Sequence, residues 1–154
     1  MESISVLDMF KIGIGPSSSH TLGPWKAAQR FIDVIGDRVD QIEHLEVQLF
    51  GSLAKTGQGH GTDIALMLGL SGKDPVEFEV DRIDPTVEKI RQEKRLNFGG
   101  KGWIDFNPEN HIHFLKEEIK DFHPNALTFL CRFKDTTLEK ETYFSVGGGF
   151  VVKE

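Results

Sequence analysis

The first segment whose residues could do chemistry is a run of small hydroxyl residues around a histidine. It comprises Ser17, Ser18, Ser19, His20 and Thr21, and it stands directly before a predicted helix. Backbone N–H groups at a helix start are unpaired and carry partial positive charge, and the hydroxyls add further donors. The segment therefore suits a carboxylate or phosphate oxygen, with a titratable imidazole beside it. The alternative is structural: Ser19 or Thr21 only caps the helix, and the rest is a polar turn.

A second segment places a histidine between glycines. His60 lies between Gly59 and Gly61 and is followed by Thr62 and Asp63. Glycines let the backbone approach a ligand closely and leave the imidazole uncrowded, and the next predicted helix start is again suited to an anion. Asp63 is near enough in sequence to orient or tune His60. Alternatively, Asp63 is a plain N-cap and the glycines are turn residues. The segment lacks the Lys-Ser/Thr ending of a P-loop.

A third segment is the glycine triplet Gly147, Gly148 and Gly149, within an apolar stretch close to the last residue. In a strand context it indicates a bulge, a close approach of the backbone to something else, or a simple bend. The apolar stretch is either a last strand buried in the sheet, or it marks a chain cut from a longer one or a subunit that docks here.

The remaining candidate residues carry weaker signals. Cys131 lies on an alternating apolar face and is predicted to be a core residue. His111 and His113 share one face of a predicted strand, as metal ligands can. No third ligand is evident nearby, so we predict solvent-facing side chains and no metal site. His44 and His123 are predicted to lie at the surface.

The composition is that of an acidic globular domain. Of the 154 residues, 38% are hydrophobic, and 24 acidic against 18 basic residues give a net charge of −6. This balance predicts no nucleic-acid partner, and no apolar run approaches the roughly 20 residues that span a membrane. The N-terminus lacks a secretory signal, which predicts a cytoplasmic protein. One cysteine excludes an intrachain disulfide and any site built from several thiolates of this chain.

Apolar periodicity and turn residues predict the elements that must position these segments. We expect a helix from Pro24 to a stop at Gly36, a glycine-rich loop over 51–61, a buried helix over 64–70 capped by Thr62 or Asp63, and a surface helix from about 85, capped by Asp84, to 96. Strands are expected over 45–50, 103–106, 111–115, 127–133 and 138–146, the second and third forming a hairpin around 107–110. Because helices and strands are segregated along the chain, the predicted fold class is α+β, a mostly antiparallel sheet with helices packed on it, in a single domain over 1–154.

Four segments together resemble one family. Residues 5–24 are similar to the opening of the iron–sulfur L-serine dehydratases, and residues 51–63 resemble their second signature. Residues 96–100 and 145–150 resemble two more, in the same order. The match covers essentially the whole chain, with one departure, the bulky Trp25 after Gly-Pro, which we expect to alter packing against a partner domain.

The resemblance implies an enzyme that converts L-serine to pyruvate and ammonia without pyridoxal phosphate. It implies a [4Fe-4S] cluster whose open iron site polarises the leaving hydroxyl, held by cysteines of an alpha domain or separate alpha chain. The present chain resembles only the beta domain, which in turn is similar to the allosteric substrate-binding domain of some D-3-phosphoglycerate dehydrogenases. This chain alone would then bind no cofactor and be inactive. A homodimer is plausible in this family.

The resemblance also suggests roles for the candidate residues. His60 is the preferred base for the Cα proton, and His20 is the second choice, or else it holds the carboxylate or acts as the acid. The predicted substrate-binding residues are Ser17, Ser18, Ser19, Thr21, Gly61, Thr62, Asp63, Gly147 and Gly148. Two other classes stay open: a regulatory serine-binding module without chemistry, and a Ser-His hydrolase, which lacks the Gly-x-Ser-x-Gly elbow.

Overall fold

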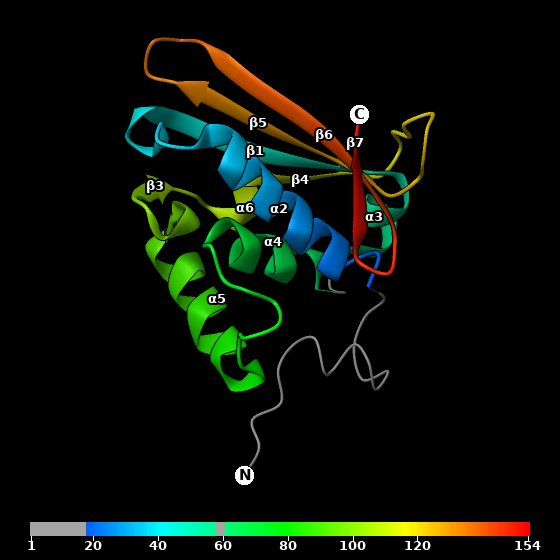
Figure 1. Ribbon diagram of the computed structural model, residues 1–154, viewed down its shortest axis with the longest axis horizontal. Helices are drawn as coiled ribbons and strands as arrows, with labels where there is room; N and C mark the ends of the chain where they lie inside the picture. The colour runs from blue at the N-terminus through cyan, green and yellow to red at the C-terminus, as the bar shows by residue number, and fades with distance from the viewer. Residues whose placement is uncertain (1–17, 58–60) are drawn as a thin grey trace.

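The computed structural model describes residues 18–57 and 61–154 (Figure 1). Its helices are α2 (Leu22–Ile35), α3 (Gly51–Gly57), α4 (Thr62–Leu70), α5 (Ile83–Glu93) and α6 (Pro108–His111). Its strands are β1 (Ile42–Phe50), β2 (Arg95–Asn97), β3 (Trp103–Asp105), β4 (Ile112–Leu115), β5 (Ala126–Phe133), β6 (Leu138–Gly147) and β7 (Phe150–Lys153). Short 3₁₀ turns cover Val39–Gln41, Val80–Arg82 and Phe98–Gly100.

A mixed five-stranded sheet forms one layer of the molecule, with strand order β4-β1-β5-β6-β7. The pairs β1–β5, β5–β6 and β6–β7 are antiparallel, whereas β1–β4 is parallel. Strands β2 and β3 form a separate antiparallel ribbon. The predicted α+β class with a mostly antiparallel sheet is therefore confirmed.

The predicted hairpin around residues 107–110 is wrong. Strand β3 pairs with β2, and β4 joins the main sheet beside β1, with Val47 opposite Ile112. Between them the chain forms the short helix α6, because the Asn107 side chain accepts a hydrogen bond from the N–H of Glu109 and Pro108 occupies the first turn. A turn sequence and an N-cap sequence use the same residue types, so composition did not separate the two.

Helices α2 and α4 cover one face of the sheet, and α5 packs outside α4 (Figure 1). The core lies between them. Phe31 of α2 stacks on Phe129 of β5 with ring centres 4.9 Å apart and meets Phe98 edge-on at 6.5 Å. Cys131 is also fully buried there, as predicted. The helix α4 is buried along most of its length, which explains why it is apolar on nearly every side.

The crossing of α2 and α4 is tight because Gly69 has no side chain. A Cβ at Gly69 would lie 2.8 Å from the backbone oxygen of Trp25 and 2.9 Å from Cβ of Ala28. The Trp25 indole is almost wholly buried, meets Phe78 edge-on, and donates its N–H to the carbonyl of Lys73 at 2.7 Å. Trp25 therefore fills a gap inside this chain, and its expected effect on packing against a partner domain stays a prediction.

Several predicted element boundaries also change. The glycine-rich loop begins with the helix α3, whose Leu53 and Ala54 are fully buried. The N-cap of α4 is Gly61, with Thr62 as the first helical residue, and the N-cap of α5 is Arg82, so neither predicted side-chain cap is used. Helix α5 stops at Glu93, so that Leu96 belongs to β2.

The last strand is not buried within the sheet, as one alternative held. Strand β7 is an edge strand that pairs only with β6, and Phe150 at its start is 72% exposed. The neighbouring Val146 and Val152 are exposed as well. The end of the sheet formed by β6 and β7 therefore presents apolar side chains to its surroundings.

Candidate functional site

The centre of the candidate site is His20, in the turn before α2. Its Nδ1 lies 3.0 Å from Oγ of Ser19, and its Nε2 lies 3.1 Å from Oγ of Ser52 in the first turn of α3. Both ring nitrogens therefore have hydroxyl neighbours. A neutral imidazole can donate to one of them and accept from the other, and it exchanges these roles when its tautomer changes. The ring is thus placed between two groups that can carry a proton.

The same turn is fixed from two further elements. The Thr62 hydroxyl, at the start of α4, donates to the carbonyl oxygen of His20. The Ser145 hydroxyl, near the end of β6, donates to the carbonyl oxygen of Ser19 at 2.7 Å. Thr62 and Ser145 are fully buried. The starts of α2, α3 and α4 and the end of β6 therefore meet at residues 19–20, although they are far apart in the sequence.

Glycines allow this close approach. A Cβ at Gly23 would lie 1.8 Å from Oγ of Ser145, so no other residue fits there without displacing the serine. A Cβ at Gly149 would lie 2.7 Å from a side-chain methyl of Leu22. Gly149 also has φ +80°, a conformation that glycine adopts without strain. Of the triplet, it is thus Gly149 that packs most closely against α2.

The other two glycines of the triplet leave space. Gly147 has φ +104°, and no described atom lies within 4 Å of the point where a Cβ would stand, whereas Gly148 has φ +60° with only Phe150 near it. Their predicted role as ligand-binding backbone is therefore sterically possible. The close approach that the sequence suggested for the triplet is observed at its third member.

Asn125 was missed by the sequence analysis. Its backbone oxygen accepts from the N–H of Ser145 at 2.9 Å, so Asn125 and Ser145 are cross-strand neighbours and their side chains leave the sheet on the same face. The Asn125 Oδ1 atom is buried and has no hydrogen-bond partner among the residues that the structure describes. Such an acceptor is costly to leave unpaired, and it lies on the helix-covered side of the sheet, where Ser145 contacts Ser19.

The remaining predicted residues are placed as follows. Ser17 and His60 lie outside the described residues. Ser18 accepts the N–H of Gly23 at its carbonyl, and Thr21 is the N-cap of α2. Gly61 has φ +90°, which a residue with a side chain rarely adopts.

Asp63 is engaged elsewhere. Its carboxylate forms an ion pair of 3.0 Å with Arg91 of α5. The pair joins α4 to α5 and points the carboxylate toward that helix. The predicted pairing of Asp63 with His60 remains a prediction, because His60 lies outside the described residues.

Ser52 and Ser145 were not predicted as site residues, although a sequence pattern could have identified them. Each lies within a glycine-containing segment that resembles a family signature. Asn125 had no such pattern, since its significance comes only from its register with Ser145.

The histidines of the open sheet face form a second polar cluster. His44 and His113 both lie beside one oxygen of Glu46, at 3.3 and 3.2 Å, and the rings of His44 and His111 meet edge-on at 5.0 Å. His44 and His113 are therefore not plain surface residues. Within residues 18–57 and 61–154, no three His, Cys, Asp or Glu side chains are arranged to hold a metal ion.

These groups shift one another's titration. Burial raises the pKa of Glu46, but hydrogen bonds and positive charge from His44 and His113 outweigh it, so the pKa of that carboxyl is lowered overall. Burial and the neighbouring His44 and His113 lower the pKa of His111. The Nδ1 of His111 accepts the N–H of Asn107 at 3.0 Å, which also requires the neutral ring.

The site around His20 can bind a small polar molecule and move a proton. It offers hydroxyls of Ser19 and Ser52, an imidazole between them, and the N-terminal ends of α2 and α4 close by. Helix starts favour anionic groups, and a free amide oxygen favours a donor such as an ammonium group. The described part of the chain contains no helix with the length and apolar character required to cross a bilayer.

Known proteins match this chain along nearly its full length. The profile of the serine dehydratase beta chain family matches residues 5–154. The chain is 43% identical to an L-serine dehydratase of Haemophilus influenzae, 38% identical to L-serine dehydratase 1 of Escherichia coli and 39% identical to an L-serine dehydratase of Streptomyces coelicolor. Each alignment covers 98% or more of this chain but 34% of the relative, so the chain spans about a third of their length.

The segments of this α+β domain that resemble family signatures meet around His20, and the similarity to the relatives extends along nearly the whole chain. Together these two findings define the class of the protein. The chain belongs to the serine dehydratase beta chain family.

Proposed function

We propose that this chain is the beta part of an L-serine dehydratase, which converts L-serine to pyruvate and ammonia. In this proposal it supplies substrate-binding and acid–base groups to an active site completed by an alpha part. The carrying observation is the convergence of Ser19, His20, Ser52, Thr62 and Ser145, which come from three separate family-like segments. A fold alone does not require these segments to share hydrogen bonds, whereas a common site does.

The roles follow from what dehydration of serine needs. A base must take the Cα proton, and the carboxylate must be held. His60 is the preferred base, and His20 is the second choice, held between the Ser19 and Ser52 hydroxyls. The hydroxyl turn 17–21 and the starts of α2 and α4 would hold the carboxylate, with Gly61, Thr62, Gly147 and Gly148 around it. Asp63 would contribute its backbone N–H at the start of α4, since its carboxylate is paired with Arg91. In the assembled site, the Oδ1 of Asn125, buried and without a partner among the described residues, would accept a hydrogen bond from the substrate ammonium group.

The chain does not offer ligands for the [4Fe-4S] cluster that the family resemblance implies. Its single cysteine, Cys131, is fully buried in the core, and burial raises the pKa of that thiol to about 11. A cluster requires several thiolates. We therefore propose that the cluster is held by the alpha domain or chain, and that this chain acts on the substrate only through the groups named above.

The test is turnover of L-serine by the enzyme assembled from this chain and its alpha part. The variants His20→Gln and His60→Gln are made separately. The variant that lacks the proton-transferring histidine is expected to have a kcat/KM lower by about a hundredfold or more. His113→Gln, on the opposite face of the sheet, is the matched control and should retain activity within about twofold. Near-normal turnover in both the His20 and the His60 variant would overturn the assignment.

The alternative function is a regulatory serine-binding module without chemistry. Calorimetry with L-serine on this chain alone separates the two, since tight binding without the alpha part favours the sensor. Pyruvate formation by the isolated chain would contradict both proposals. A cytoplasmic location and a homodimer complete the proposed function, with the alpha part and L-serine as partners.

A further inference from the structure

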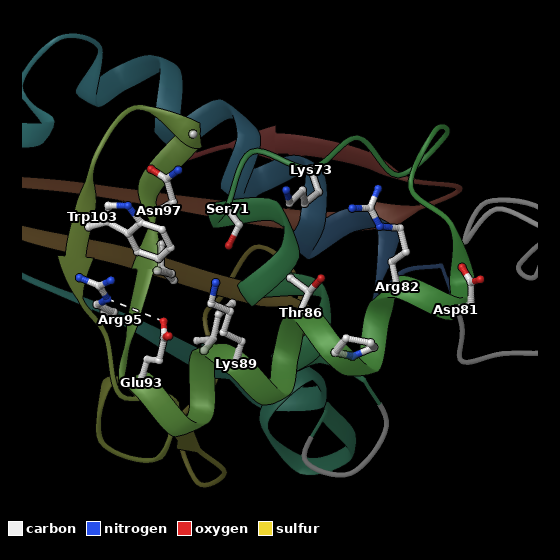
Figure 2. A pocket seen from close by; sticks show the side chains of 14 residues that line it. Ser71, Lys73, Asp81, Arg82, Thr86, Lys89, Glu93, Arg95, Asn97 and Trp103 are labelled. Carbon is white, nitrogen blue, oxygen red and sulfur yellow. Dashed lines mark ion pairs between the residues drawn. The ribbon is translucent and has the colours of Figure 1, made fainter.

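A cavity of about 500 Å³ lies on the far side of α4 from the sheet, between α5, the segment after α4, and the β2–β3 ribbon (Figure 2). None of the residues of the candidate site around His20 lines it. Its size falls within the range of roughly 300–1,000 Å³ that is usual for small-molecule pockets. The proposed function leaves this cavity unexplained.

The cavity is lined by four cationic side chains from three different segments. Lys73 follows α4, Arg82 directly precedes α5, Lys89 lies within α5, and Arg95 begins β2. The chain as a whole carries a net charge of −6, so this concentration of positive charge runs against its overall balance. Figure 2 shows Lys89 rising from α5 toward the segment that carries Ser71 and Lys73. The ammonium groups therefore face a common space from two sides.

Three of these cations lack a counterion among the described residues. No carboxylate of residues 18–57 and 61–154 lies within 4 Å of the charged groups of Lys73, Arg82 or Lys89, whereas Arg95 is paired with Glu93 at 3.7 Å. The second acidic residue of the lining, Asp81, is not within ion-pair distance of any of them. A ligand with two or more negative charges would balance this excess, and a zwitterion such as free serine, with no net charge, would not.

One wall of the cavity is aromatic. Trp103 on β3 is 51% exposed, and the guanidinium of Arg95 lies 4.5 Å from the centre of its ring. Contact with the ring and the ion pair with Glu93 hold the Arg95 guanidinium beside Trp103. The space beside Gly100 on this wall is open, because no described atom lies within 4 Å of where its Cβ would stand. An exposed indole beside a fixed guanidinium favours a planar or apolar group on the ligand.

We propose that this cavity binds a small organic dianion, a phosphate monoester or a dicarboxylate. Its charged group lies between Lys73, Lys89 and Arg82, and its planar or apolar part lies against Trp103. Thr86 and Asn97 line the same space and can donate hydrogen bonds to the anionic oxygens.

Tryptophan fluorescence tests the proposal directly, because the chain has two tryptophans and only Trp103 is exposed. The chain is titrated with adenosine monophosphate, inorganic phosphate and succinate, with zwitterionic L-serine as the comparison that carries no net charge. We expect a saturable change with at least one of the dianions and none with L-serine. Comparing the affinities for adenosine monophosphate and succinate shows whether the cavity prefers a phosphate monoester or a dicarboxylate. Comparing adenosine monophosphate with inorganic phosphate shows whether the planar group contributes to affinity.

Substitutions locate the signal. Lys89→Gln and Lys73→Gln are each expected to raise the dissociation constant about tenfold, because each removes one charge-assisted contact. Lys140→Gln, on an exposed position of β6, is the matched control and should leave the dissociation constant within about twofold. Trp103→Phe should abolish the fluorescence change, and calorimetry then measures the remaining affinity. Circular dichroism confirms that each variant is folded.

Three outcomes would overturn the proposal. They are the absence of saturable binding for all three dianions, an equal loss of affinity in Lys140→Gln and Lys89→Gln, and an undiminished fluorescence change in Trp103→Phe. Since none of these measurements uses serine turnover, their failure would leave the proposed dehydratase function untouched.

Discussion

The Ser145 hydroxyl donates a hydrogen bond of 2.7 Å to the backbone carbonyl of Ser19, 126 residues earlier in the chain. This contact joins the end of β6 to the turn that carries His20. It exists because Gly23 leaves room for the serine. The placement of His20 therefore depends on a strand residue that never touches the imidazole itself.

Ser145→Ala removes this contact and leaves a buried carbonyl without its donor. We expect a loss of about 1–3 kcal/mol in the free energy of unfolding and a lower kcat/KM for serine in the assembled enzyme. Ser71→Ala is a matched control, because its buried hydroxyl also donates to a carbonyl, that of Met67, remote from His20. Urea unfolding should detect a loss in both variants, and only Ser145→Ala should slow turnover. Equal turnover in the two variants would contradict the positioning role.

Phe31→Ala should destabilise the chain strongly. The ring is fully buried, stacked on Phe129 and edge-on to Phe98, so its removal leaves a cavity in the core. We expect a loss of about 3–5 kcal/mol, measured by chemical denaturation. Phe150→Ala, at a position 72% exposed, should change stability by less than about 0.5 kcal/mol. A loss below about 1 kcal/mol for Phe31→Ala would indicate that the core is packed differently.

Gly69→Ala should also destabilise the chain, although alanine is the better helix former by about 1 kcal/mol. The added methyl group would lie within 2.9 Å of both Trp25 and Ala28 on α2, so the two helices must move apart. We expect a net loss of about 1–3 kcal/mol and a lower thermal midpoint. An unchanged or higher midpoint would show that the α2–α4 crossing is looser than these distances indicate.

Cys131 should be unreactive in the folded chain. The thiol is fully buried, and burial raises its pKa to about 11, so almost none of it is thiolate near neutral pH. With the disulfide reagent DTNB we expect no labelling in native buffer and one equivalent in denaturant, because the chain has one cysteine. Rapid labelling of the native chain would contradict the burial.

The polar cluster of His44, Glu46, His111 and His113 should make the free energy of unfolding depend on pH. Because the pKa of His111 is lower in the folded chain than its usual value near 6.5, the unfolded chain binds more protons as the pH falls below that value. The free energy of unfolding should therefore decrease from about pH 7.5 toward about pH 5.5, as protonated His111 would face His44 and His113 and lose the bond from Asn107. The carboxylates of Glu46 and Asp105, which also face it, favour protonation and only reduce the effect.

The lowered pKa of Glu46 affects stability in a lower pH range than that of His111. Its contribution to stability is present above the unfolded value near 4.5 and is lost as the pH falls through the folded value.

Thermal midpoints of the wild-type chain and of His111→Gln, measured between about pH 7.5 and about pH 5.5, isolate the contribution of His111. The variant should show a shallower dependence of the thermal midpoint on pH. Parallel slopes would assign the dependence to other groups.

The sequence predicted those elements whose signal is local. The helix α2 and the strands β5 and β6 follow from apolar periodicity, and the buried α4 follows from its uniformly apolar composition. Strand β4 was assigned to the wrong partner because its partner β1 lies about sixty positions earlier in the sequence. Helix α3 was taken as a loop because glycines bound it, although Leu53 and Ala54 are buried inside the fold.

In the candidate site, too, some residues could be predicted from local sequence and others could not. His20, Ser19 and Thr62 could be predicted because they lie in motifs of unusual composition. Asn125 could not, since one asparagine before a strand has no distinguishing pattern, and only the pairing of β5 with β6 brings it beside Ser145. The cationic cavity is likewise built from single lysines and arginines on three segments, and the sequence predicted only a surface helix where α5 lies.

Strand β1 lies inside the sheet, between β4 and β5, and both partners follow it in the chain by more than sixty residues. During synthesis from the N-terminus, β1 therefore leaves the ribosome long before it can form a single ladder hydrogen bond. Its apolar face, with Leu45, Val47 and Leu49, must wait unpaired or rest temporarily against α2. Sheets with such distant pairings form slowly, so the apolar face of β1 stays without its strand partners until β4 and β5 have been made.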